Sequence, residues 1–339
     1  MKNIALLGSG FIAGVHMEGW KRISGANVVA FFEVVPEKVR NFQEKYSIPH
    51  YSSLPRLFEE KDIDIVDICL PTFLHRDYVL QAAQAGKHII CEKPMALNVE
   101  DAVAMKNACQ LNGVELMIGH ALRFWGEYKK AKELVLQGKI GKILSIDAYR
   151  LSVSPTWSVI SWILQQNLSG GAALDLHIHD LDFANWIGGK PIEVFSRGVQ
   201  SVNGSWDHAQ TSVRYGDGII ANVEGGWMMK GEFPFTMGYR IMGTEGVIEW
   251  EFRAGVNIEQ RGEANPVFVY RDGEKEEKIN AQDDDAYYLE LKYFFDCIEN
   301  HRPIEKATAD HGITAVRVAT AARESMEKGI IVKLGSSPI

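Results

Sequence analysis

The stretch N-I-A-L-L-G-S-G-F-I-A, residues 3–13, decides the fold of the N-terminal part of this chain. A short apolar run precedes its glycines, and a helical pattern follows them. Gly8 permits a tight turn, Gly10 lets the backbone approach a pyrophosphate, and Ala13 is small enough for close packing of helix on strand. The helix N-terminus offers unpaired N–H groups to phosphate oxygens. The stretch therefore predicts a strand, a phosphate-binding loop and a helix.

The residues that follow alternate between patterns typical of strands and of helices. Strands are expected at residues 3–7, 27–33, 64–70, 88–91 and 115–119, and helices at residues 11–23, 36–45, 76–85 and 99–111. This alternation predicts an α/β domain with a parallel, doubly wound sheet of the Rossmann type. Ligands of such sheets bind beyond the carboxyl ends of the strands, so functional residues are expected there.

Glu33 ends the second expected strand about twenty residues after the glycines, where an acidic side chain accepts hydrogen bonds from the ribose of a dinucleotide. Its charge would repel the 2′-phosphate of NADP, and Val34 and Val35 supply no arginine to bind one. The sequence therefore predicts NAD as the cofactor, in preference to NADP. The alternative is that Glu33 only ends the edge of a strand.

The motif Glu92-Lys93-Pro94 follows another apolar run, Ile89–Cys91. Pro94 fixes its own φ and restricts Lys93 to extended conformations, so the proline aims the lysine. Lys93 is expected where the nicotinamide lies, with its ammonium group bonded to the reacting oxygen of a substrate. The alternative is a surface ion pair of Glu92 with Lys93, worth less than ~1 kcal/mol. The apolar residues that lead into the motif disfavour that alternative.

A helix is expected over residues 170–186, with Asp175, His179 and Asp182 at positions i, i+4 and i+7 on one stripe. Histidine titrates near ~6.5, which suits a general acid/base at neutral pH, and we assign His179 that role. Asp175 would hold a substrate hydroxyl or orient the imidazole, whereas Asp182 is expected to be structural. The alternative is a solvated acidic face. Residues two apart on a helix point about 200° apart, so His177 and His179 do not converge and no metal site is predicted.

The pattern changes after about residue 125, where hairpin-like segments replace the strand–helix alternation. Turns at residues 216–218 and 271–273 contain Asp-Gly and separate expected strands. We therefore predict a Rossmann domain over residues 1–122 and an α+β domain over residues 123–339. The second domain would contain a large, mainly antiparallel, open-faced sheet, and the C-terminal helix would pack back on the first domain.

These segments together resemble the Gfo/Idh/MocA family of oxidoreductases, which includes glucose–fructose oxidoreductase and inositol dehydrogenases. The resemblance runs through essentially the whole chain and is carried by residues 8–13, 70–75, 92–94, 119–124 and 170–182. The sequence departs from the family pattern at Thr72, where the family often has Asn, and at His177, where it commonly has Gly. The resemblance implies that the open face of the sheet pairs with another subunit, as a homodimer or homotetramer.

The candidate site residues form three overlapping sets. Cofactor contacts are predicted for Gly8, Gly10, Phe11, Ile12, Glu33, Pro71, Thr72, His75, Glu92 and Lys93. Substrate contacts are predicted for Lys93, His120, Arg123, Arg150, Asp175 and His179. The catalytic set is Lys93, Asp175 and His179. Interdomain salt bridges are an equal alternative for Arg123 and Arg150.

Composition excludes several classes of partner. The formal net charge is −8 and no block of Lys or Arg occurs, so nucleic acid is not an expected partner. No apolar run approaches the ~20 residues of a membrane span. The four cysteines are scattered without CxxC spacing, and the first residues lack the pattern of a signal peptide. A cytoplasmic protein with reduced thiols is therefore expected.

The expected function is that of an NAD-dependent dehydrogenase acting on CH–OH groups. It would transfer a hydride between the nicotinamide and a hydroxyl carbon of a sugar, inositol or related polyol, so the expected partner is a small, carbohydrate-like molecule. Two alternatives stay open, namely an NAD-dependent glycosidase that uses transient redox and a non-catalytic NAD-binding sensor. The fold itself does not choose the substrate.

Overall fold

The computed structural model describes residues 1–155, 161–254 and 265–335. The chain divides into two compact units, residues 1–124 with 284–313 and residues 125–283 with 314–339. Residues 284–313 thus belong to the first unit, whereas the sequence analysis assigned everything from residue 123 onward to the second domain.

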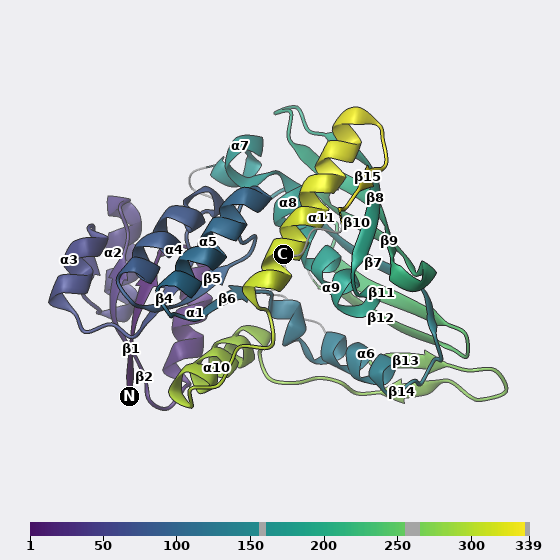
Figure 1. Ribbon diagram of the computed structural model, residues 1–339, viewed down its shortest axis with the longest axis horizontal. Coiled ribbons are helices and arrows are strands. Elements are labelled where there is room, and N and C mark those ends of the chain that lie inside the picture. The colour runs from purple at the N-terminus through teal and green to yellow at the C-terminus, as the bar shows by residue number, and fades with distance from the viewer. Residues whose placement is uncertain (156–160, 255–264, 336–339) are drawn as a thin grey trace. The chain divides into compact units, whose positions relative to one another are not determined.

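The first unit contains a six-stranded sheet in which all neighbouring strands are parallel, with the order β3-β2-β1-β4-β5-β6. Helices α4 and α5 pack side by side on it, as Figure 1 shows. Its strands are β1 Lys2–Leu7, β2 Ala26–Phe32, β3 His50–Tyr51, β4 Ile65–Ile68, β5 His88–Glu92 and β6 Leu116–Gly119. Its helices are α1 Phe11–Lys21, α2 Pro36–Tyr46, α3 Leu54–Glu60, α4 His75–Gln84, α5 Val99–Leu111 and α10 Ala286–Glu299, with the 3₁₀ turns η1 Thr72–Leu74 and η2 Ala121–Arg123. The predicted doubly wound parallel sheet is confirmed.

Helix α10 belongs to this unit because it packs on α1. Gly19 of α1 leaves room for it, since a Cβ there would lie 2.8 Å from Cδ1 of Leu291. At the edge of the contact, Arg22 forms an ion pair with Asp284 at 2.5 Å and lies over the ring of Tyr288. The sequence pattern shows that α10 is a helix, but not which helix it packs against.

The second unit is built on a nine-stranded sheet with the order β14-β13-β12-β11-β7-β10-β9-β8-β15. Strands β7 and β10 are parallel, and the other neighbours are antiparallel. Its strands are β7 Ile143–Val153, β8 Pro191–Gln200, β9 Trp206–Tyr215, β10 Ile220–Met229, β11 Thr236–Gly243, β12 Val247–Arg253, β13 Val267–Tyr270, β14 Glu277–Ile279 and β15 Val332–Lys333. Its helices are α6 Gly126–Leu136, α7 Gln166–Ser169, α8 Ala172–Asp175 and α9 Ile178–Gly188, with the 3₁₀ turns η3 Ser161–Leu164 and η4 Gly216–Gly218. Helix α11, Ala309–Lys328, begins in the first unit and continues in the second from Thr314.

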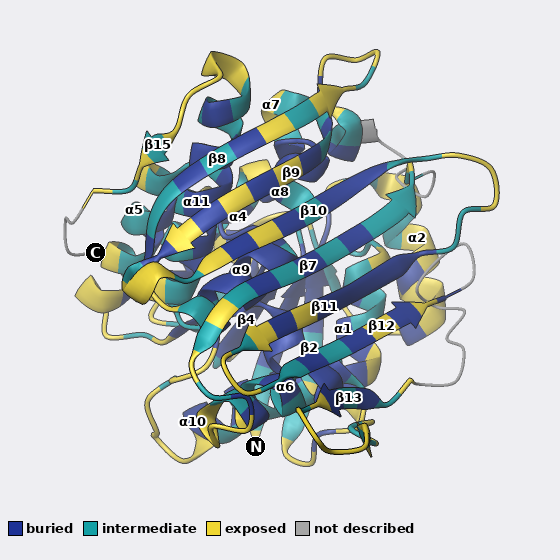
Figure 2. Ribbon diagram, turned by 90° about the vertical axis from the view of Figure 1, so that its right-hand side faces the viewer, coloured by how far each residue is buried: buried dark blue, intermediate teal, exposed yellow. Residues whose placement is uncertain are grey.

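The two faces of the large sheet differ. Helices α8 and α9 pack on one face, over β7, β9 and β10. There the rings of Tyr128, Phe183, Tyr239 and Trp250 form a buried aromatic cluster with centroids 4.8–5.9 Å apart. Figure 2 shows the opposite face, where exposed and buried residues alternate along the strands. The predicted mainly antiparallel sheet is confirmed.

One expected helix is interrupted. Residues 170–186 do not form a single helix, because α8 ends at Asp175 and α9 begins at Ile178. Between them the N–H of His177 donates to the carbonyl of Ala172, five residues earlier. This wider turn breaks the regular spacing that the sequence analysis used for Asp175 and His179.

In the part of the chain that the structure describes, every helix is too short or too polar to cross a bilayer.

Candidate functional site

The loop after β1 has the geometry expected of a phosphate-binding loop. Gly8 has φ +104°, and a Cβ there would lie 2.5 Å from the carbonyl oxygen of Cys69, so only glycine fits. Gly10 is the N-cap of α1, makes no side-chain cap, and has open space where a Cβ would point. A ligand phosphate can therefore approach the first turn of α1 without a side chain in its way.

Glu33 lies beside this loop at the carboxyl end of β2. Its carboxylate is buried and accepts from the Ser9 hydroxyl at 2.8 Å and from the N–H groups of Val34 and Val35 at 2.8 and 3.0 Å. These bonds hold the acid against the glycine loop. An open helix N-terminus beside a fixed carboxylate fits the pyrophosphate and adenine ribose of NAD. The contact of Glu33 with the ribose stays a prediction.

Three exposed apolar side chains follow the neighbouring strands β1, β2 and β4. They are Phe11, Val34 and Phe73, exposed to 49%, 61% and 40%. Val34 lies in the loop after β2, Phe11 is the first residue of α1 and Phe73 lies in η1, all at the carboxyl edge of the parallel sheet. Exposed apolar groups gathered at one edge are typical of a ligand surface, and a flat adenosine suits them.

His75 ties two of these loops together. The side chain is buried, with Nδ1 2.9 Å from the carbonyl oxygen of Pro94 and Nε2 2.8 Å from that of Leu70. Burial lowers the pKa of His75, although both carbonyl oxygens oppose that shift. The ring links the loop after β4 to the loop after β5. Direct contact of His75 with the cofactor, predicted from the sequence, remains untested.

Lys93 and Glu92 differ in burial. Lys93 is half-buried at the end of β5, and its peptide bond to Pro94 is cis. The Glu92 side chain turns inward, accepts from the N–H of Lys93 at 3.2 Å, and lies against Gly119, where a Cβ would come within 2.7 Å of its Oε1. Glu92 is therefore part of the strand exit and not a surface partner of the lysine ammonium.

Asp175 and His179 are half-buried, whereas the neighbouring Asp180 and Asp182 are buried. The two predicted catalytic residues are thus the acid and the histidine of this segment that keep access to solvent. Lys93, His120 and Arg123 belong to the first unit, and Arg150, Asp175 and His179 belong to the second. Their roles stay predictions.

Arg150 has a buried ionic partner. Its Nε and Nη2 donate to the two carboxylate oxygens of Asp180 at 2.7 and 3.2 Å, and both side chains are at most 4% exposed. Burial raises the pKa of Asp180, and the guanidinium opposes that shift. Both residues belong to the second unit, so this pair is not an interdomain salt bridge. A substrate contact by Arg150 stays a prediction, and the geometry favours a structural role.

His177 is also internal. It is fully buried, with Nε2 2.8 Å from the Thr211 hydroxyl, whose oxygen lies 2.9 Å from that of Ser196. Gly225 makes room for the ring, since a Cβ there would lie 2.4 Å from Nδ1. Burial lowers the pKa of His177 to about 3, and His208 adds to the shift. His177 is therefore a neutral anchor between α9 and the sheet, not a residue of an exposed pocket.

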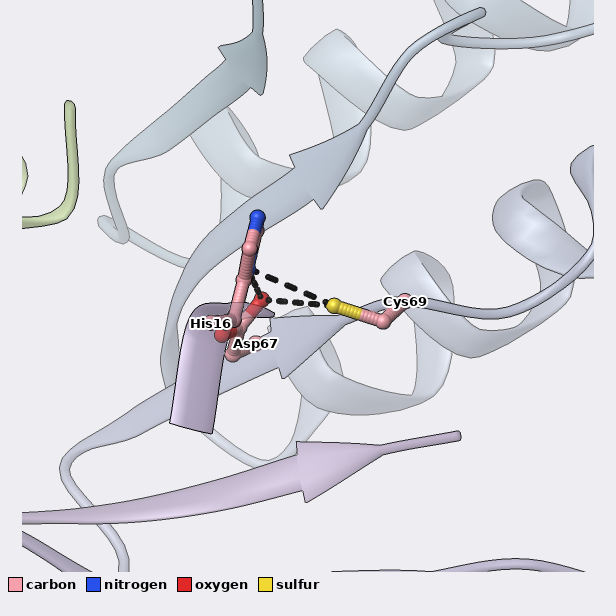
Figure 3. A group of neighbouring side chains, drawn as sticks. All are labelled: His16, Asp67 and Cys69. Atoms are coloured by element: carbon pink, nitrogen blue, oxygen red, sulfur yellow. Dashed lines mark hydrogen bonds and ion pairs between the residues drawn. The ribbon is translucent and has the colours of Figure 1, made fainter. Parts of the chain in front are cut away.

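Sequence reasoning missed a buried polar cluster below the glycine loop. In Figure 3, Nδ1 of His16 lies 3.0 Å from both carboxylate oxygens of Asp67 and 3.3 Å from the Cys69 thiol. Burial acts to lower the pKa of His16, but Asp67 and Cys69 outweigh it, and the pKa is raised well above its usual value. Burial also raises the pKa of the Cys69 thiol. The only signal in the sequence is a histidine on the face of α1 where apolar residues are expected.

Comparison with known proteins agrees with this architecture. Residues 2–120 match the model of the Gfo/Idh/MocA oxidoreductase family for its NAD-binding Rossmann fold, and residues 132–334 match the model for its C-terminal alpha/beta domain. The chain belongs to the Gfo/Idh/MocA oxidoreductase family. The resemblance inferred from the sequence is confirmed, and residues 2–120 are the family's NAD-binding domain.

Two of the similar proteins match over nearly the full length and a third over about half of the chain. Myo-inositol 2-dehydrogenase of Thermotoga maritima is 28% identical, with 98% of each chain covered. The crystal structure of aldose-aldose oxidoreductase from Caulobacter crescentus, complexed with glycerol, is 26% identical with a TM-score of 0.84 and covers 98% of this chain and 99% of its own. 2,7-Anhydro-N-acetylneuraminate hydratase of Mediterraneibacter gnavus is 33% identical over 57% of this chain and 51% of its own.

Proposed function

We propose that this chain is an NAD-dependent oxidoreductase that transfers a hydride between the nicotinamide and a hydroxyl-bearing carbon of a sugar, inositol or related polyol. The observation that carries the proposal is the position of Lys93, directly after β5 at the carboxyl edge of the NAD-binding sheet. The names of relatives that act on inositol and aldoses support the substrate class.

The proposed roles follow from the proton demand of the reaction. Bound NAD supplies the hydride acceptor. His179 takes the hydroxyl proton of the alcohol on its imidazole and returns it when the carbonyl is reduced. The ammonium of Lys93 donates a hydrogen bond to the reacting oxygen and stabilises the negative charge that develops there. Asp175 orients the imidazole or holds a second hydroxyl of the substrate.

A panel of polyols, inositols and aldoses tests the activity, with NADH formation read by absorbance. On the best substrate, Lys93→Met and His179→Ala should each reduce turnover at least ~10²-fold, the usual lower range for loss of a charge stabiliser or an acid/base. NAD affinity should change little, because other residues bind the pyrophosphate and adenine ribose. Imidazole added to His179→Ala should restore part of the rate, and Lys93→Met should not respond. Near-normal turnover in both variants would place the chemistry elsewhere.

The relative named as a hydratase favours a second candidate, in which NAD is reduced and reoxidised within one turnover and no net redox occurs. A glycosidase or a lyase acting on an anhydro-sugar would use the same residues. Product analysis separates the two functions, because a transient-redox enzyme converts its substrate while total NADH stays constant. A sensor would show NAD binding and no conversion of any substrate in the panel.

Two properties of the whole protein complete the proposal. We expect a homodimer or homotetramer that pairs through the open face of the large sheet, and light scattering that gives only a monomer at micromolar concentration would contradict it. We also expect a cytoplasmic setting, supported by four buried cysteines that form no disulfide.

A further inference from the structure

Four buried polar atoms converge in the first unit. They are Nε2 of His16, Oε1 of Glu92 and both carboxylate oxygens of Glu290, and none of them has a hydrogen-bond partner in the part of the chain that the structure describes. The three side chains come from α1, β5 and α10, and their ligand atoms lie within 4.8 Å of one another. Buried polar atoms without partners are uncommon in folded proteins, so a missing species is indicated.

The contact between two of these atoms supports a third species between them. Nε2 of His16 lies 3.2 Å from Oε1 of Glu92, yet the pair lacks hydrogen-bond geometry. The other oxygen of Glu92 accepts from the N–H of Lys93, whereas Oε1 lies near Nε2 of His16 and the carboxylate of Glu290. A nitrogen and an oxygen that lie this close without a hydrogen bond between them are typical of two ligands of one metal ion.

Nδ1, on the other side of the His16 ring, has the partner that a metal-binding histidine commonly has. Asp67 lies 3.0 Å from Nδ1 and also accepts from Nε1 of Trp20 at 2.7 Å. This arrangement keeps a proton on Nδ1, so an ion that binds at Nε2, near Glu92 and Glu290, displaces only the other proton of the ring. Metal-binding histidines in proteins commonly have such a carboxylate behind them, itself hydrogen-bonded.

Charge favours a cation among these side chains. The carboxylates of Asp67, Glu92 and Glu290 are at most 8% exposed, and one imidazole is their only basic neighbour among the described residues of the cluster. One imidazole cannot compensate three buried carboxylates, so their burial is unfavourable without a further cation or proton. A divalent ion would neutralise Glu92 and Glu290 and satisfy all four unpartnered atoms.

We propose that His16, Glu92 and Glu290 bind a divalent transition-metal cation of the Zn²⁺ class. One neutral imidazole and two carboxylates form a ligand set that suits such ions. The adjacent triad of His16, Asp67 and Cys69 is not the site, because its members already bond to one another. The ion would join α1, β5 and α10 within the first unit and stabilise it independently of the proposed reaction.

Metal analysis of the full-length, tag-free protein tests the proposal. Protein refolded with Zn²⁺ and dialysed against metal-depleted buffer should retain about one Zn²⁺ per chain by mass spectrometry, with tetrahedral or five-coordinate bands when Co²⁺ replaces it. Glu290→Gln keeps the volume of the side chain and removes an anionic ligand, so Zn²⁺ affinity should fall at least ~100-fold. Asp67→Asn should weaken binding by ~10–100-fold, as expected for a residue behind a ligand.

Cys69→Ala is the matched control, because it removes the neighbouring thiol and leaves the proposed ligands in place. It should bind Zn²⁺ as the wild type does, and loss of the ion in this variant would assign the site to the other triad. Wild-type protein that retains no Zn²⁺ and shows no Zn²⁺-dependent rise in Tm would overturn the proposal and leave a water or a shared proton between the three side chains. The wild-type measurements test the proposal even if Glu290→Gln fails to fold.

Discussion

At the scale of single residues, Glu33 illustrates how backbone contacts prepare a side chain for its partner. Two N–H groups and the Ser9 hydroxyl orient its carboxylate before any ligand arrives. Hydrogen bonds to a charged acceptor contribute about 1.5–3 kcal/mol each. Glu33→Ala should therefore weaken NAD binding at least ~10-fold. It should also narrow the difference in affinity between NAD and NADP. Isothermal titration with both cofactors measures this, and a wild type that prefers NADP would reverse the assignment.

Arg150 and Asp180 allow a second test at this scale. Removing one member of a buried ion pair strands the other charge, so Arg150→Met should lower the free energy of unfolding by about 3–5 kcal/mol. The double variant Arg150→Met with Asp180→Leu should recover much of that loss. Arg214 pairs with Glu193 on the surface, so Arg214→Met is the matched control and should cost less than ~1 kcal/mol. Urea unfolding measures all three, and equal losses for the two single variants would contradict the argument.

Residues whose function follows from local sequence could be predicted. Gly8 and Glu33 belong to a strand–loop–helix pattern in which each position has a fixed geometric task. The role of Arg150 could not be predicted from the sequence, because its partner Asp180 lies 30 residues away. The two side chains come together only because β7 packs against α9. The His16 cluster could not be predicted for the same reason, since its members come from distant elements.

At the scale of elements, His177 links α9 to the sheet through Thr211 in a fully buried environment. Its pKa is about 3 in the folded protein and near ~6.5 when unfolded, so the unfolded state binds more protons between these values. The stability from the neutral ring is present above pH ~6.5 and is lost as the pH falls toward 3, by at most ~1.4 kcal/mol per pH unit. Wild type should therefore lose more stability than His177→Gln between about pH 6.5 and 4.5. Urea midpoints across this range measure the loss of stability, and parallel curves would show that folding does not lower the pKa of His177.

The segment around His177 also shows what periodicity misses. A stripe of polar residues over residues 170–186 predicted one helix, and the helical spacing brought Asp175 and His179 to one side. The structure keeps both residues accessible but inserts a wide turn between them. The imidazole of His177 contacts Thr211 of β9. A contact with a distant strand cannot be inferred from the spacing of residues within the segment.

At the scale of the whole molecule, the first unit is made from two separate stretches of chain. Fragment 1–124 lacks α10, which leaves the surface of α1 around Gly19 and Arg22 uncovered. We expect this fragment to be poorly folded, and a fusion of 1–124 to 284–313 through a flexible linker to give a dispersed amide NMR spectrum. A well-folded fragment 1–124 with the same thermal stability as the fusion would show that α10 is dispensable.

The discontinuity of the first unit has a consequence for biosynthesis. The ribosome delivers residues 125–283 before the last stretch of the first unit, residues 284–313, leaves the exit tunnel. The six-stranded sheet must therefore wait without α10 while the large sheet is being translated. Chains usually fold domain by domain from the N-terminus, at about 5–20 residues per second. In this protein the unit that is translated first is completed only when residues 284–313 have been made. A nascent chain stalled before residue 284 should therefore remain sensitive to proteases in its N-terminal part.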